Sequence, residues 1–283
     1  MEPEKAKLKI GLVLGGGGAR GFAHIGVLRS LEGRGFEVSA IAGCSMGGII
    51  GALHAAGYAS ERIHEIFQGF DVIRLLDPGR MGGLIGGRGI TRHLEKYLPR
   101  TFEELGLPLC VTSVDVQRGK LVVLNEGELL PALRATSALP GLFAAVRHRG
   151  RVLVDGALLN NLPVDVIRTL TTAPVVAVDT SAPADRELVF TDERSLWEKL
   201  RRPLLEGKRP LLFEMMMKAI DIPQAPLNSI RLSLNPPEVL IRPALSPDLK
   251  IEDYSKLDDA VKAGYTVAEI KLEENARVLA MSQ

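Results

Sequence analysis

Short apolar runs alternate with longer segments of helical spacing over residues 9–180. The apolar runs are rich in β-branched residues and are bounded by glycine, proline or polar residues, as strands usually are. Six of them are expected to be strands: KIGLVL (9–14), VSAIAG (38–43), PLCVTSVDV (108–116), KLVVLN (120–125), RVLVDG (151–156) and PVVAVDT (174–180). Because these runs alternate with helix-like segments, the pattern predicts an α/β fold with crossover helices and a parallel sheet.

Apolar residues at helical spacing predict the helices between these strands. The segment FAHIGVLRSLEGRG places its large apolar residues on one face, and Gly33 and Gly35 can end that helix. A second helix, MGGIIGALHAAG (46–57), follows its strand with almost no loop. Residues 74–89 hold six glycines and a proline amid apolar residues, which predicts a mobile surface segment outside the sheet.

The pattern changes after Ser181. Residues 193–224 are helix-like, but prolines interrupt them and three methionines occur in a row. A helix pair with one apolar face buried on the core is the simplest interpretation, and an exposed lipid- or partner-binding face is the alternative. One more strand is expected in EVLIRPAL (238–245), followed by an amphipathic helix over 255–280 that is either continuous or split at Gly264. The chain is therefore predicted to be one domain with a helical insertion.

Composition narrows the classes of function. Lys and Arg total 35 against 34 for Asp and Glu, a balance that gives no electrostatic reason to expect a nucleic-acid partner. Cys44 and Cys110 are too few for a disulfide framework and lack the spacing of metal ligands, which suits a reducing compartment. Five glycines and Arg20 break the apolar segment near the N-terminus, which argues against a secretion signal or a membrane span. These features favour a cytoplasmic protein without a structural metal.

Two glycine-rich stretches follow the first two expected strands. LGGGGARG (14–21) exposes bare backbone after the first strand. GCSMG (43–47) matches G-x-S-x-G between a strand and a helix, where a serine in a strained turn presents its hydroxyl at the end of the sheet. The dipole of the following helix favours negative charge near that serine. Ser45 is therefore a candidate nucleophile, and Cys44 is expected to be a small packed residue.

A serine nucleophile needs a base, and the histidines are poorly placed for that role. They lie on expected helices as surface or half-buried residues (His24, His54, His64), after the glycine-rich segment (His93) and in the basic RHRGR turn (His148). None ends a late strand, where a triad histidine is expected in an α/β hydrolase. Asp155 does end an apolar strand, and Gly156 follows it. This aspartate either caps a turn or, at the sheet edge shared with Ser45, acts as a general base in a partly apolar pocket.

Three ordered motifs, GGGARG (16–21), GCSMG (43–47) and DGA (155–157), together resemble the signature of the patatin-like phospholipases. Bacterial members related to the catalytic domain of neuropathy target esterase are the most similar. The resemblance implies a three-layer α/β/α fold with a mostly parallel central sheet and a helical C-terminal extension. It implies a family core over residues 11–168, with a strand and helices of residues 169–283 packed on the same domain.

The resemblance also implies a Ser-Asp dyad without histidine, in which Ser45 is the nucleophile and Asp155 takes its proton. N–H groups of the glycine-rich loop are implied to form the oxyanion hole, around Gly16, Gly17 and Gly18. The other motif residues, expected to support the site, are Arg20, Gly21, Gly43, Met46, Gly47, Gly156 and Ala157. Arg20 is expected to order the loop, to attract a phosphate headgroup or to form a surface salt bridge. Ala157 departs from the D-G-G that the family often has, and no cofactor or metal is implied.

The implied function is hydrolysis of acyl esters of phospholipids or lysophospholipids through an acyl-enzyme, in the cytoplasm or peripherally at the inner face of a membrane. Residues 77–89 and the Met-rich segment are expected to form a mobile apolar rim that meets the membrane or the acyl chain. One alternative is a non-catalytic lipid-binding or interaction module that has kept the fold. The spacing of Gly16, Gly18 and Gly21 suggests a dinucleotide-binding oxidoreductase as a second alternative. That fold requires an Asp or Glu at the end of the second strand, where this chain has AGCSMG.

Overall fold

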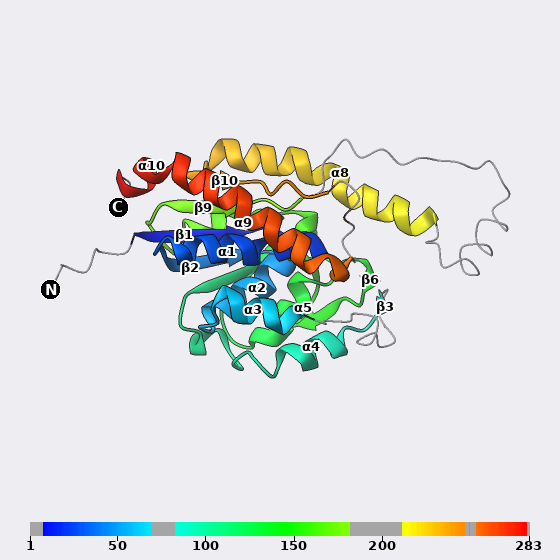
Figure 1. Cartoon of the computed structure of the whole chain (residues 1–283). Helices are drawn as coiled ribbons and strands as arrows, with labels where there is room; N and C mark the ends of the chain where they lie inside the picture. The colour runs from blue at the N-terminus through cyan, green and yellow to red at the C-terminus, as the bar shows by residue number, and fades with distance from the viewer. Residues whose placement is uncertain (1–7, 69–82, 182–210, 247–248, 250–252, 282–283) are drawn as a thin grey trace.

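Helices cover both faces of a mixed β-sheet in the computed structural model, which describes residues 8–68, 83–181, 211–246, 249 and 253–281 (Figure 1). The strands are β1 (Lys9–Leu14), β2 (Glu37–Gly43), β3 (Gly83–Ile85), β4 (Leu109–Asp115), β5 (Lys120–Leu124), β6 (Gly141–Phe143), β7 (Val146–His148), β8 (Arg151–Asp155), β9 (Val175–Val178) and β10 (Val239–Ile241). The α-helices are α1 (Ala23–Gly33), α2 (Met46–Ala55), α3 (Ser60–Phe67), α4 (Arg88–Leu94), α5 (Leu129–Thr136), α6 (Val164–Ile167), α8 (Leu211–Leu234), α9 (Leu257–Glu274) and α10 (Ala276–Met281). Short 3-10 helices include η1 (Gly18–Phe22) and η4 (Gly156–Leu158). The expected α/β class is confirmed.

The main sheet has the strand order β10-β9-β1-β2-β4-β8-β7, and β5 also pairs with β4. Neighbours from β10 to β4 are parallel, whereas β5, β8 and β7 pair antiparallel. All six runs expected before residue 181 contain a strand, and the neighbours from β10 to β4 are parallel as expected. β5 and β8 depart from the parallel arrangement, and the short strands β3, β6 and β7 lie outside the expected runs. For β5 the reason is its connection, because residues 116–119 join β4 and β5 as a hairpin and are too short for the crossover that parallel strands need. β8 forms a second hairpin with β7 and pairs antiparallel with β4.

Side chains of the central strands alternate between two buried cores. In β1, Leu12 and Leu14 pack toward α1, α2 and α9, whereas Val13 packs toward α6 and α8. These three side chains are fully buried, as expected for a strand with helices on both faces. The three-layer α/β/α arrangement thus holds the end of β1 rigidly at the point where the glycine-rich loop begins.

The C-terminal region extends the same sheet and packs on α1. β9 and β10 pair in parallel beside β1, and α9 lies against α1 (Figure 1). The two helix backbones are so close that a Cβ added to Gly264 would lie 2.0 Å from the carbonyl oxygen of Ala23. Gly264 is therefore a helix-crossing residue. Of the two forms expected for the closing helix, the split at Gly264 is wrong, because α9 continues to Glu274 and α10 follows it.

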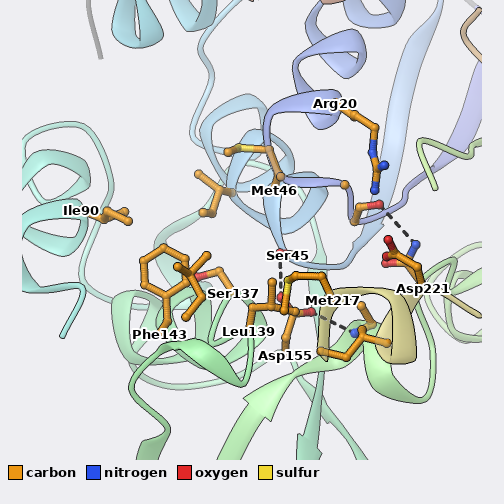
Figure 2. A pocket seen from close by; sticks show the side chains of 18 of the residues that line it. Arg20, Ser45, Met46, Ile90, Ser137, Leu139, Phe143, Asp155, Met217 and Asp221 are labelled. Atoms are coloured by element: carbon orange, nitrogen blue, oxygen red, sulfur yellow. Dashed lines mark hydrogen bonds between the residues drawn. The ribbon is translucent and has the colours of Figure 1, made fainter. Parts of the chain in front are cut away.

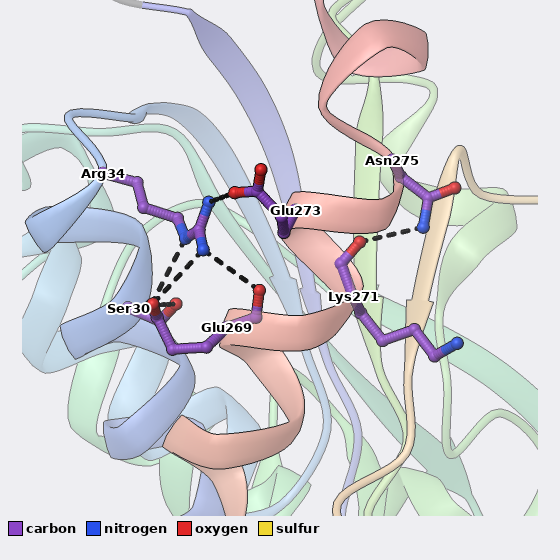
Figure 3. A network of polar contacts seen from close by, with 6 residues as sticks. All are labelled: Ser30, Arg34, Glu269, Lys271, Glu273 and Asn275. Carbon is purple, nitrogen blue, oxygen red and sulfur yellow. Dashed lines mark hydrogen bonds and ion pairs between the residues drawn. The ribbon is translucent and has the colours of Figure 1, made fainter.

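Polar contacts line the solvent edge of this helix pair (Figure 3). The Arg34 guanidinium lies 2.7 Å from a carboxylate oxygen of Glu273 and 3.2 Å from one of Glu269, and Ser30 Oγ donates to Glu269. At the end of α9, the side-chain amide of Asn275 donates to a backbone carbonyl of the last turn, 2.8 Å away. Exposed ion pairs contribute little to stability, so the pairing of α1 with α9 depends mainly on its close backbone packing.

Two expected segments lie partly outside the described residues. Of the glycine-rich segment, residues 74–82 are outside, and Gly83–Ile85 forms β3, which pairs with β6 in a small second sheet. Of the expected helix pair, residues 193–210 are outside, and the rest begins α8, a helix of 24 residues that continues through Pro223 and Pro226. Within the described part of the chain, no helix is long and apolar enough to cross a membrane.

Candidate active site

β2 and β8 meet end to end along one edge of β4. β5 occupies the other edge of β4, so β2 and β8 must share the remaining one. Gly43 of β2 lies opposite Val111, and Asp155 of β8 lies opposite Ser113. Because the two strands run in opposite directions, their carboxyl ends face each other. The sheet therefore brings the turn that carries Ser45 to the end of β8.

This meeting differs from the expected one. Asp155 and Ser45 are expected to share an edge because parallel strands end there, whereas β8 arrives from the opposite direction. The approach is tight, since a Cβ added to Gly156 would lie 2.4 Å from the carbonyl oxygen of Thr112 in β4. This explains why glycine follows Asp155.

Ser45 occupies a strained turn between β2 and α2. Its backbone has φ 51° and ψ −123°, a left-handed conformation that costs energy for any residue but glycine. Its N–H donates to Thr136 Oγ1 at 2.9 Å, which holds the turn from α5. The turn also needs small neighbours, because a Cβ added to Gly47 would lie 2.1 Å from the carbonyl oxygen of Leu14. The serine hydroxyl is thereby directed away from the helix.

The Asp155 carboxylate lies directly below that hydroxyl (Figure 2). Ser45 Oγ donates to Asp155 Oδ2 at 2.8 Å, and the backbone N–H of Ala157 donates to Oδ1 at 2.9 Å. Burial raises the pKa of the Asp155 carboxyl to about 6, although these hydrogen bonds oppose the shift. A carboxylate with raised proton affinity, in contact with a hydroxyl, can accept the proton of that hydroxyl as it attacks.

Cys44 is packed as expected, and it also contacts the carboxylate. Its side chain is fully buried, and Sγ donates to Asp155 Oδ1 at 3.6 Å. Burial, with the nearby Asp155 charge as a smaller cause, raises the pKa of the thiol well above its usual range. The thiol therefore stays protonated and acts as a weak hydrogen-bond donor to the carboxylate. Nothing in the motif spacing distinguishes this contact from simple packing.

The glycine-rich loop lies beside Ser45. A Cβ added to Gly16 would lie 3.1 Å from Ser45 Cβ, so glycine permits the approach. The Gly16 N–H is engaged, because it donates to the backbone carbonyl of Asn161 at 3.2 Å. The N–H groups of Gly17 and Gly18, in contrast, have no hydrogen-bond partner among the described residues. These two donors are the ones available to an anion.

A pocket with about 900 Å³ of empty space, partly open to solvent, surrounds these groups. Its lining combines the Ser45 and Asp155 side chains and the glycine loop with apolar side chains from α2, α3, α4, α8, η4 and the β6 region. The apolar lining residues are Met46, Ile49, Phe67, Ile90, Leu94, Leu139, Leu142, Phe143, Ala157, Met217 and Ile220. In Figure 2, Ile90 and Phe143 lie to one side of Ser45, and Arg20 and Asp221 lie to the other. The pocket thus has an apolar side and a charged side.

Arg20 lines this pocket and is only 5% exposed. Arg20 is therefore not a surface residue, and its expected roles of ordering the loop, attracting a phosphate headgroup or forming a salt bridge stay predictions. Gly21, in the same motif, allows the loop to pass Met46, since an added Cβ would lie 2.7 Å from Met46 Cγ. Both residues thus belong to the wall that the glycine-rich loop contributes.

His24 has a structural place behind the loop. It is fully buried, not surface-exposed or half-buried as expected, and its Nε2 lies 2.7 Å from the carbonyl oxygen of Gly15. Burial lowers its pKa to about 4, so the ring is neutral at pH 7 and donates from Nε2. Among the described residues no histidine lines the pocket, and no cluster of His, Cys, Asp or Glu could hold a metal ion.

Two relatives show what this chain resembles in sequence. An uncharacterized NTE family protein of Mycobacterium tuberculosis is 38% identical over 180 residues, covering 60% of this chain and 48% of the relative. Lysophospholipase NTE1 of Meyerozyma guilliermondii is 28% identical over 272 residues, covering 92% of this chain and 19% of the relative. The chain thus spans about half the length of the first relative and about a fifth of the second.

A solved structure shows the fold, and a family model shows the family. VipD from Legionella pneumophila superposes with a TM-score of 0.58 at 16% identity, over 95% of this chain and 68% of that protein, which shows a shared fold. The model of the patatin-like phospholipase family matches residues 12–168, more than half of the 283 residues. The chain belongs to the patatin-like phospholipase family.

Proposed function

We propose that this protein is a serine hydrolase that cleaves acyl esters of phospholipids or lysophospholipids, with Ser45 as nucleophile and Asp155 as general base. The observation that carries the proposal is the 2.8 Å hydrogen bond from Ser45 Oγ to Asp155 Oδ2 at the base of a largely apolar pocket. A relative is named lysophospholipase, which supports the substrate class. A non-catalytic lipid-binding module would have no need for a strained serine in contact with a buried carboxylate.

In the proposed reaction, Ser45 Oγ bonds to the acyl carbon while its proton passes to Asp155 Oδ2. The carbonyl electrons move onto oxygen, and the N–H groups of Gly17 and Gly18 stabilise the resulting oxyanion. When the ester C–O bond breaks, Asp155 returns the proton to the leaving alcohol oxygen and the acyl group stays on Ser45. Water then attacks the acyl-enzyme along the same route, and fatty acid is released.

The two sides of the pocket suit the two parts of a lipid. The side with Ile90 and Phe143 matches an acyl chain, and the Arg20 guanidinium on the other side matches a phosphate headgroup. The direct experiment measures fatty acid released from phosphatidylcholine and from lysophosphatidylcholine, with the Ser45→Ala variant as control. Release by the wild type alone supports the proposal. Lipid binding by both proteins without release would favour the non-catalytic module instead.

Activity is expected to fall on the acid side with a midpoint near pH 6. Only ionised Asp155 can accept the serine proton, and burial raises its pKa to about 6, so kcat/KM for a soluble ester should drop about tenfold per pH unit below the midpoint. The Cys44→Ser variant should move the midpoint to lower pH, because a hydroxyl donates to Asp155 more strongly than a thiol does. An acid limb near pH 4 in the wild type, or none at all, would contradict the role of Asp155.

The proposal includes peripheral contact with the inner face of a membrane through α8. Gln224, Ile220 and Met217 face the pocket from this helix. On its outer side, Met215 is 50% exposed and Ile222 is 57% exposed. An exposed apolar side on a helix whose opposite side lines a lipid pocket suits a lipid surface, and it would hold the pocket beside the membrane. The other two methionines do not contribute, because Met217 lines the pocket and Met216 packs on the Cα of Gly141.

Replacing both Met215 and Ile222 by aspartate is expected to reduce co-sedimentation with phosphatidylcholine vesicles at least tenfold, because two apolar anchors are lost and two charges are added. The matched control is Ile270→Asp on α9, which changes a side chain of similar exposure, 52%, outside the pocket wall. That variant should bind vesicles as the wild type does. Equal binding by all three proteins would remove the proposed role of α8.

A further inference from the structure

Asn161 holds both backbone polar groups of Gly16, its N–H and its carbonyl. The Gly16 N–H donates to the backbone carbonyl of Asn161 at 3.2 Å, and the Asn161 side-chain Nδ2 donates back to the Gly16 carbonyl at 3.2 Å. Thr180 Oγ1 adds a longer contact to the same carbonyl at 3.3 Å. Asn161 is only 2% exposed and lines the pocket. The loop residue nearest to Ser45 is therefore fixed by one buried asparagine.

This contact determines where the next N–H group points. In a trans peptide the carbonyl and the following N–H point in opposite directions. Because Nδ2 of Asn161 and Oγ1 of Thr180 draw the Gly16 carbonyl toward themselves, the Gly17 N–H points away from both. Gly17 lines the pocket, and its N–H has no partner among the described residues.

We propose that Asn161 is a positioning residue that fixes the orientation of the Gly16–Gly17 peptide and thereby aims the Gly17 N–H at the oxyanion. The inference rests on the proposed hydrolase function and names the side chain that makes its oxyanion site rigid. Glycine-rich backbone is intrinsically free to rotate, so an N–H donor there needs a side chain to hold it. A donor fixed before the reaction costs no reorganisation when charge develops.

The Asn161 amide is itself oriented by a second contact. Its Nδ2 also donates to Ser181 Oγ at 3.0 Å, and Asn228 Nδ2 of α8 donates to the same hydroxyl at 3.0 Å. The Gly16 carbonyl can only accept, so it faces the NH₂ end of the amide, and Ser181 helps to hold the amide in that place. With Asn161 changed to aspartate, an oxygen would replace the donor at nearly constant shape and repel that carbonyl.

The neighbouring Asn160 offers a matched control. It is also fully buried, but its Nδ2 donates to Asp165 Oδ1 at 2.9 Å and it does not line the pocket. Asn160→Ala and Asn161→Ala therefore remove the same group from adjacent buried positions, and only the second touches the loop. Both changes cost stability, which thermal unfolding measures separately from activity.

The test uses a soluble p-nitrophenyl ester and a trifluoromethyl ketone, which forms a tetrahedral oxyanion on a serine nucleophile. Asn161→Ala and Asn161→Asp should each lower kcat about 100-fold, with KM within threefold of the wild-type value. Both variants should also bind the ketone more weakly, by a similar factor. Asn160→Ala should keep kcat and ketone affinity within threefold of the wild type. Ser181→Ala should give an intermediate loss and serves as the second variant if the Asn161 variants do not fold.

Two results would overturn the inference. The first is ketone affinity in folded Asn161 variants, or in Ser181→Ala, that equals the wild-type value. The second is an equal loss of kcat in Asn160→Ala and Asn161→Ala, which would assign the effect to packing. Failure of the hydrolase proposal looks different, since the wild type would then lack Ser45-dependent turnover, and the inference would fall with it.

Discussion

Replacing Ser45 by alanine is expected to lower kcat/KM for ester hydrolysis by at least 1,000-fold, and Asp155→Asn should have an effect of the same order. The first change removes the attacking oxygen, and the second replaces the proton acceptor, 2.8 Å from that oxygen, by an amide that cannot take a proton. Because the two groups act in one step, the double variant should be no slower than the worse single variant. Kinetics with a soluble chromogenic ester measure all three.

Unfolding experiments separate loss of chemistry from loss of structure in the Asp155→Asn variant. Burial raises the pKa of Asp155 from 3.8 to about 6, so the folded state binds this proton more tightly than the unfolded state does. Above pH 6 the folded protein therefore carries a cost of about 3 kcal/mol for the ionised group, at about 1.4 kcal/mol per pKa unit. Asparagine avoids this cost.

The Asp155→Asn variant should accordingly be more stable than the wild type at pH 8. The advantage should shrink as the pH falls from 6 to 4 and vanish below that range, where both states of the wild type are protonated. Denaturant midpoints across this pH range give the measurement. An inactive variant that is also less stable at pH 8 would point to a structural role for Asp155, and substantial turnover by either single variant would contradict the dyad.

The sequence predicts the positions of the strands better than their directions. Each of the six expected runs before residue 181 contains a strand, because alternation of β-branched residues and turn signals is a local property. Direction depends on how distant chain segments pair, and β8 pairs antiparallel with β4, about 40 positions earlier in the chain. Asp155 nevertheless lies beside Ser45, as the motifs predict. The motifs identify the residues that meet, but they contain no information on the direction of the strands that carry them.

Buried residues that hold the glycine loop in place are harder to predict from the sequence. His24 and Asn161 both hold carbonyls of the glycine loop, yet their spacing in the sequence resembles that of ordinary helix and turn residues. The contacts that give them a role span 9 and 145 positions along the chain. The asparagine pair two residues after the DGA motif is a signal that could have drawn attention to Asn161. Exposure of Met215 in α8 is likewise decided by tertiary packing and not by helical periodicity.

Gly26→Ala is expected to destabilise the protein by about 3 kcal/mol, a large effect for adding one methyl group. An added Cβ at Gly26 would lie 1.9 Å from the carbonyl oxygen of Val261 and 2.5 Å from the backbone nitrogen of Tyr265. Backbone atoms cannot move aside as a flexible side chain can, so α1 and α9 must separate and the core between them loosens. Thermal unfolding should show the melting temperature lowered by roughly 6 °C or more.

The matched control is Gly33→Ala at the end of the same helix. A Cβ there meets nothing within 4 Å, so alanine should leave stability unchanged or raise it by up to about 1 kcal/mol through its better helix propensity. The same methyl group on one helix should therefore act with opposite signs at two positions seven residues apart. If both variants unfold at the wild-type temperature, α9 does not pack on α1 at this distance. If only Gly26→Ala is destabilised, the C-terminal helix is part of the structure that holds η1 and the glycine loop behind Ser45.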